Sequence, residues 1–156
     1  IGTSLGNFVH IVNVFWPDSN YRHDLSHRQN RHVYEGGVAL KPTFAFTMGN
    51  VISNAGLGDG AGGQRNLEFL AEHEELHVWQ SRLFGPLYQG TYVAWATGGF
   101  FVACVAWWFV DDVTTLEDFG SLVETASYYN NPFEYWAYKN HGNWDTNGAH
   151  PELKWS

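Results

Sequence analysis

The chain has 156 residues, and its 8 Lys and Arg stand against 16 Asp and Glu, a formal net charge of −8. This length suits one domain with its own core, and the single cysteine, Cys104, excludes an internal disulfide framework. The acidic balance argues against a nucleic-acid partner and against binding acidic lipids by charge alone. Aromatic residues make up 17% of the chain, a content typical of membrane interfaces or large apolar clefts.

The first part of the chain predicts a small sheet. Residues 1–16 carry no charge and are too short to cross a bilayer, which takes about 20 residues. They predict either a β-rich core segment or the end of a longer apolar segment. Residues 17–32 are polar and predict a loop or a short surface helix, so the role of residues 1–32 stays open. Two segments rich in β-formers, residues 32–40 and about 43–53, predict two strands.

The second part of the chain predicts helices. A glycine-rich loop ends near Gln64, and from Asn66 apolar residues recur at spacings of three and four. Gly85 and Pro86 should stop or kink that helix. Further helices are predicted over about 86–110, 115–128 and 131–142, followed by an irregular tail at 143–156. The predicted fold is therefore α+β, a small antiparallel sheet packed on three to four helices in one domain.

The segment EHEELHVWQ suggests a metal site. His73 and His77 lie four residues apart, so on a helix their imidazoles share one face and can bind one ion. Two neutral imidazoles and a carboxylate suit zinc, which keeps a fourth position for water. Glu74 could reach that water and act as general base in peptide-bond hydrolysis, the logic of H-E-x-x-H. The alternative is a helix whose two histidines are ordinary polar groups.

A third ligand must come from elsewhere in the chain, and Glu134 is the first candidate. It stands in the first turn of a predicted helix, behind Pro132 and among aromatic residues, where it should be partly buried. A buried carboxylate needs a partner, and a cation supplies one. Alternatively, Glu134 only balances the dipole at the start of its helix. Glu124 and Asp111 are rival ligands.

Other polar residues carry weaker signals. Tyr138 or His141 could donate a hydrogen bond to the oxyanion of a tetrahedral intermediate. A histidine favoured by the dipole at a helix C-terminus would explain His141 as well. His23 and His27 also lie four residues apart, but their segment is short and polar, which favours a solvated loop.

Four short motifs occur in order along the chain: FTMGN from Phe46, HEELHVWQ from His73, GPLY from Gly85 and NPFEYWAY from Asn131. Together they resemble a family of mostly uncharacterised bacterial zincin-like proteins, membrane-associated metallopeptidases of the gluzincin type. The resemblance covers about residues 33–140. The long apolar stretch after Gly85 and the histidine-rich segment before Val33 depart from the family's pattern.

The resemblance implies a zincin-like fold with zinc as cofactor. It assigns His73, His77 and Glu134 as zinc ligands and Glu74 as general base. It also implies that the strand from Phe46 flanks the cleft, where an extended peptide or protein substrate could pair with it.

An apolar run suggests contact with a membrane. No charged residue stands between Arg82 and Asp111, and residues 91–110 have the length and aromatic ends of a membrane span. A single crossing would place Glu134 on the opposite side of the membrane from the two histidines. Residues 111–133 are too acidic to cross the bilayer back to the first side. If Glu134 is the third ligand, the run therefore predicts a re-entrant hairpin broken at residues 97–99, peripheral membrane contact, or a buried central helix. If the third ligand is another residue, a true span stays open. The side of the membrane stays open.

Two functions follow from these features. The first is a membrane-associated zinc metallopeptidase acting on a peptide or protein substrate. The second is a non-catalytic accessory or structural subunit, whose aromatic surface meets a membrane protein partner. Glu74 favours the first, because a structural zinc site is usually closed by four protein ligands and rich in cysteine.

Overall fold

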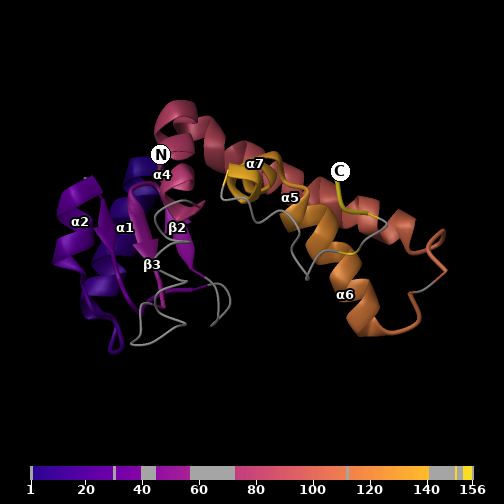
Figure 1. Ribbon diagram of the computed structural model, residues 1–156, viewed down its shortest axis with the longest axis horizontal. Helices are drawn as coiled ribbons and strands as arrows, with labels where there is room; N and C mark the ends of the chain where they lie inside the picture. The colour runs from indigo at the N-terminus through magenta and orange to yellow at the C-terminus, as the bar shows by residue number, and fades with distance from the viewer. Residues whose placement is uncertain are drawn as a thin grey trace. The chain divides into compact units, whose positions relative to one another are not determined.

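The computed structural model describes residues 2–29, 31–39, 45–56, 73–111, 113–140, 150 and 153–155. These residues are mostly helical and include one three-stranded sheet, so the prediction of mixed helix and strand is confirmed (Figure 1). The chain divides into two compact units, Ile1–Tyr88 and Gln89–Ser156, and each is described by itself. The prediction of one domain over the whole chain stays a prediction.

The sheet of the first unit has the order β1-β3-β2. Strand β1 (His32–Val33) runs parallel to β3 (Val51–Ser53), and β2 (Phe46–Met48) runs antiparallel to it. The prediction of a purely antiparallel sheet is therefore wrong for β1. The predicted strand over 43–53 is also wrong, because the chain reverses between β2 and β3. Gly49, with φ of 61°, adopts the positive φ that a two-residue hairpin turn requires.

Helix α1 (Gly2–Phe15) corrects the prediction of a β-rich segment at the start of the chain. Among residues 4–15 of this helix, Gly6, Val9 and Asn13 are buried, spaced by three and four, so one helical face packs inward. A Cβ at Gly6 would lie 2.8 Å from the backbone oxygen of Met48, which shows how closely α1 approaches the sheet. Packing on the sheet outweighs the β preference of the Val and Phe residues.

Two further helices contact the sheet. Helix α2 (His23–Gln29) confirms the short surface helix, so the solvated loop predicted for His23 and His27 is wrong. Helix α4 (Glu75–Phe84) confirms the helix of the metal motif. The predicted start of that second helix, at residues 66–72, lies outside the described residues. Gly85 ends α4 with φ of 55°, as predicted. The buried apolar residues of this unit include Val9, Val33, Tyr34, Val51, Ile52, Ala55 and Val78.

The second unit consists of helices. Helix α5 (Pro86–Ala106) leads into it, and α6 (Leu116–Glu124), the π-helix η2 (Thr125–Tyr129) and α7 (Pro132–Asn140) follow. The predicted helix starts are confirmed: Thr115 forms a capping box with Asp118, and Pro132 takes the first position of α7. The predicted end at Gly142 and most of the tail lie outside the described residues. A core of Ala103, Val113, Leu122 and Ala126 holds this unit together.

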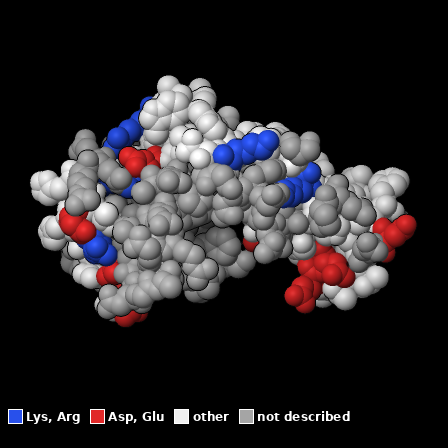
Figure 2. Space-filling model, in the orientation of Figure 1, with Lys and Arg blue, Asp and Glu red and all other residues white. Residues whose placement is uncertain are grey.

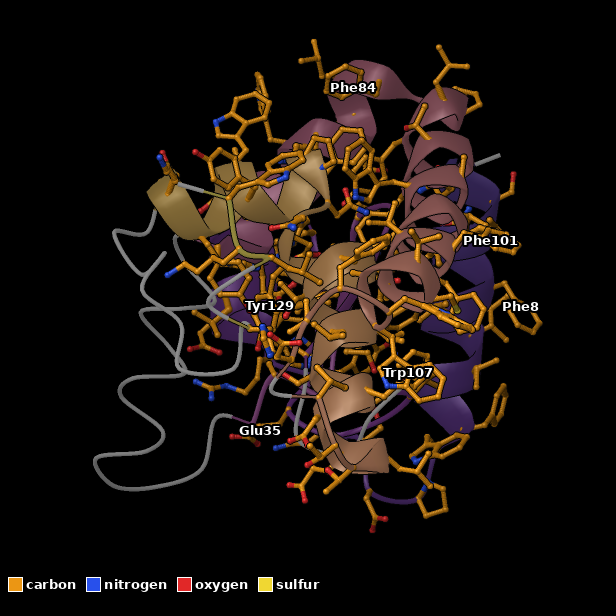
Figure 3. All side chains as sticks on the ribbon, turned by 90° about the vertical axis from the view of Figure 1, so that its right-hand side faces the viewer. Phe8, Glu35, Phe84, Phe101, Trp107 and Tyr129 are labelled. Atoms are coloured by element: carbon orange, nitrogen blue, oxygen red, sulfur yellow. The ribbon has the colours of Figure 1, made fainter. Side chains whose placement is uncertain are left out.

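Helix α5 runs without a break through residues 97–99, so the predicted hairpin is wrong. Phe101 projects outward from α5 (Figure 3), and much of the helix surface is exposed and apolar, so α5 is not a buried central helix either. Among the described ranges, however, no helix combines the length and the apolar content that a bilayer crossing needs. The large apolar side chains exposed on α5 are Leu87, Val93, Trp95, Phe100, Phe101, Val102 and Val105, and the exposed Trp107, Trp108 and Phe109 follow the helix.

Candidate metal centre

The two histidines of the motif face one another at the start of α4. His73 is 0% exposed and His77 is 4% exposed. Their Nε2 atoms lie 3.1 Å apart. Two nitrogen ligands of a tetrahedral zinc ion, each about 2.0–2.1 Å from it, would be separated by about 3.4 Å. The pair therefore already has nearly the spacing that a shared ion requires.

The His77 ring is oriented by contacts on its other nitrogen. The Oε1 atom of Gln80 lies 2.9 Å from His77 Nδ1, and the Tyr88 hydroxyl lies 3.2 Å from the same nitrogen. A carbonyl oxygen can only accept, so the contact with Gln80 is a hydrogen bond in the tautomer that carries its proton on Nδ1. The lone pair of His77 is then on Nε2, the atom that faces His73. A hydrogen bond of this kind fixes the tautomer that binds metal.

Glu74 is held by the sheet. It directly precedes α4, is buried, and its Oε2 accepts a hydrogen bond from the Thr47 hydroxyl on β2. This contact fixes one carboxylate oxygen and leaves the other oxygen as an acceptor for a further donor. Strand β2 thus lies beside the predicted general base, in line with the expectation that the strand from Phe46 flanks the site.

Glu134 lies in the first turn of α7 and is 4% exposed. The Tyr92 hydroxyl donates a 2.8 Å hydrogen bond to its Oε1. His73, His77 and Glu134 are all buried, and each offers a ligand atom for a metal ion. In the described parts of the chain no other three or more His, Cys, Asp or Glu residues form a candidate metal group. The group could therefore hold a metal ion.

The rival ligands and the weaker candidates lie elsewhere. Glu124 and Asp111 do not belong to the group, and neither do His23 and His27, which are exposed on α2. As ligands, Glu124, Asp111 and the pair of His23 and His27 thus find no support in the described residues, whereas His73, His77 and Glu134 remain the candidate set.

Of the two predicted oxyanion donors, His141 lies outside the described residues. Tyr138 is buried on α7, with its hydroxyl 3.5 Å from that of Tyr128. Burial first, and then the charge of Glu134, raises the pKa of Tyr128 well above its ordinary value. Tyr128 therefore keeps its proton at neutral pH and stays a hydrogen-bond donor.

Sequence reasoning missed the residues that hold the site. Thr47 and Gln80 stand inside the FTMGN and HEELHVWQ motifs, so both were visible but had no assigned role. Tyr92 stood out only as an aromatic residue at one end of the apolar run. Its contact with Glu134 joins residues 42 positions apart, a pairing that no local pattern signals.

Comparison of this chain with protein-family models, with curated proteins and with solved structures finds no match. The likeness to zincin-like metallopeptidases therefore stays a resemblance of four short motifs.

Proposed function

We propose that this protein is a zinc-dependent metallopeptidase whose metal ligands are His73, His77 and Glu134. The observation that carries the proposal is the pair of buried imidazoles with facing Nε2 atoms 3.1 Å apart. Glu134, a buried carboxylate of the second unit, is the proposed third ligand. The donor set supports zinc, because two imidazoles and one carboxylate leave a position open for water.

Zinc bound there would supply a Lewis acid that activates water and polarises the scissile carbonyl. The chain's own residues would do the rest. Glu74, steadied by Thr47, would take the proton from the attacking water and pass it to the leaving amine. Tyr138 is the candidate donor to the oxyanion, since its hydroxyl is buried beside that of Tyr128.

The first test is metal content by mass spectrometry on protein purified without chelator and then supplied with zinc. The parent should hold one zinc per chain, and Glu134→Ala should lose it. Glu124→Ala is the matched control, because Glu124 is the half-buried rival ligand on α6 and should keep its zinc. Zinc retained by Glu134→Ala would remove Glu134 from the ligand set, and a parent without zinc would refute the metal proposal.

The second test separates catalysis from metal binding. Glu74→Gln should keep zinc and lose about 10²- to 10⁴-fold in turnover of a peptide library, the usual contribution of a general base. Turnover equal to the parent would show that Glu74 is not the base.

The exposed apolar surface of α5 favours a second candidate, a non-catalytic subunit of a membrane protein assembly. Large exposed apolar patches mark contact with proteins or membranes. In Figure 2 acidic side chains gather over α6, whose first turn carries Glu117 and Asp118, so the contact would not depend on anionic lipid. For both candidate functions, we propose that the protein lies peripherally at a membrane. Zinc binding without any peptide turnover would favour the subunit over the peptidase.

A further inference from the structure

Arg31 is a buried charge without a matched partner. Its side chain is 3% exposed, and within the part of the chain that the structure describes none of its Nε, Nη1 and Nη2 atoms has a hydrogen-bond partner. Buried guanidinium groups are normally paired, because desolvation of the charge is costly. All three guanidinium nitrogens of Arg31 can therefore donate hydrogen bonds to a bound acceptor.

The backbone around Arg31 is fixed from two sides. Its backbone N–H donates to the backbone carbonyl oxygen of Ser26 on α2 at 3.3 Å. The next residue, His32, begins β1 and pairs with Val51. The Ser26 hydroxyl also accepts from the N–H of Val33. The side chain thus starts from a rigid junction of helix and sheet, which is how proteins hold a binding group in place.

The guanidinium of Arg31 interacts electrostatically with the proposed general base, Glu74, and with its neighbour Glu75. Burial lowers the pKa of its guanidinium, and the charges of Glu75 and Glu74 oppose that effect. Neither carboxylate forms a hydrogen bond with Arg31 among the described residues. The guanidinium thus interacts electrostatically with the predicted general base but is not hydrogen-bonded to it.

The planar fork of arginine matches a carboxylate, which it binds through two parallel hydrogen bonds. We propose that Arg31 binds a carboxylate of the substrate, an inference that rests on the peptidase function proposed above. The carboxylate is either the free C-terminus of the peptide or an acidic side chain near the scissile bond. The enzyme would then cleave at a set distance from a negative charge.

The test measures binding of three peptides to the zinc-supplied protein by titration calorimetry, with peptide integrity checked by mass spectrometry. The probes are acetyl-Ala-Ala-Ala, its C-terminal amide, and acetyl-Ala-Asp-Ala amide. The variants are Arg31→Gln and Arg31→Lys, both checked for folding by circular dichroism. Arg22→Gln is the control, because Arg22 lies in the same unit and is already paired with Asp24 at 2.9 Å.

The parent and Arg22→Gln should bind one carboxylate probe about 10- to 100-fold more tightly than the uncharged amide, as a charged hydrogen bond predicts. Arg31→Gln should lose this preference, and Arg31→Lys should retain only part of it. Tight binding of the free acid identifies a C-terminal carboxylate, and tight binding of the Asp peptide identifies a side chain. Equal affinity for all three probes, or a preference that survives in Arg31→Gln, would overturn the proposal.

Zinc content, measured on the same samples, separates this result from the fate of the peptidase. Zinc and turnover without a carboxylate preference would overturn only the role of Arg31. A carboxylate preference without zinc would support Arg31 as a binding residue and overturn the peptidase.

Discussion

Replacement of Arg31 by methionine should stabilise the unliganded protein. Methionine keeps an apolar stem of similar length but removes three nitrogens that lack partners among the described residues. Burying an unsatisfied polar group costs about 1–3 kcal/mol, and more when the group is charged. The charges of Glu75 and Glu74 offset part of that cost. Burial, the largest effect, and the charge of Arg82 act against them, and the pKa of Arg31 is lowered. We expect the free energy of unfolding to rise by about 1–3 kcal/mol.

The assay is urea unfolding of metal-free protein in chelator, with the midpoint and slope compared between parent and variant. Arg22→Met is the matched control, because Arg22 is partly exposed and paired, and its loss should cost no more than about 1 kcal/mol. Loss of 1 kcal/mol or more in Arg31→Met would refute the reasoning. Arg31 would then be a structural counter-charge for the two carboxylates, and its buried fork would not imply a ligand.

Three further predictions test the site and the two units. Gln80→Leu should weaken zinc binding about 10- to 100-fold in a competition titration, because the proton on His77 Nδ1 loses its acceptor, and an unchanged affinity would contradict this role. Gly99→Ala should lower the melting temperature, since its Cβ would lie 2.3 Å from a backbone oxygen of η2 at an overpacking cost of about 1–3 kcal/mol. Gly98→Ala, with open space around the glycine, should be neutral or stabilising by up to about 1 kcal/mol. Equal effects of the two substitutions would refute the close packing of Gly99 against η2. Burial, and then the charge of His10, lowers the pKa of His32 from 6.5, so this residue stabilises the fold above that pH and the contribution is lost as the pH falls. The parent should therefore lose more unfolding free energy than His32→Gln between about pH 7.5 and about pH 5, and parallel losses would exclude this contribution.

The sequence predicted best those features that depend on neighbouring residues. The spacing of His73 and His77 determines their shared direction once a helix forms, so the motif alone placed both imidazoles correctly. The helix boundaries at Gly85 and Pro132 follow from the special backbone of glycine and proline. The cap at Thr115 likewise depends only on Asp118, three residues further along the chain.

The errors concern contacts between distant segments. Helix α1 has a β-rich composition, and only its packing against the sheet selects the helix. The parallel pairing of β1 with β3 joins residues on either side of a long connection, which strand composition does not encode. Arg31 stands in a polar stretch that predicts surface, so nothing in the local pattern indicates that it is buried.

The contacts that hold the candidate metal residues say more about the site than the motif does. An accidental pair of histidines on a helix has no need for Gln80 on one ring nitrogen, and a carboxylate that only balances a helix dipole has no need for Tyr92. Both contacts orient a ligand atom, which any metal site requires, whether structural or catalytic. Thr47 differs from them, because it holds Glu74, which is not one of the three grouped residues. A structural metal site has no use for that contact, whereas a general base must be kept in position, so Thr47 is the feature that favours an enzyme over an accessory subunit.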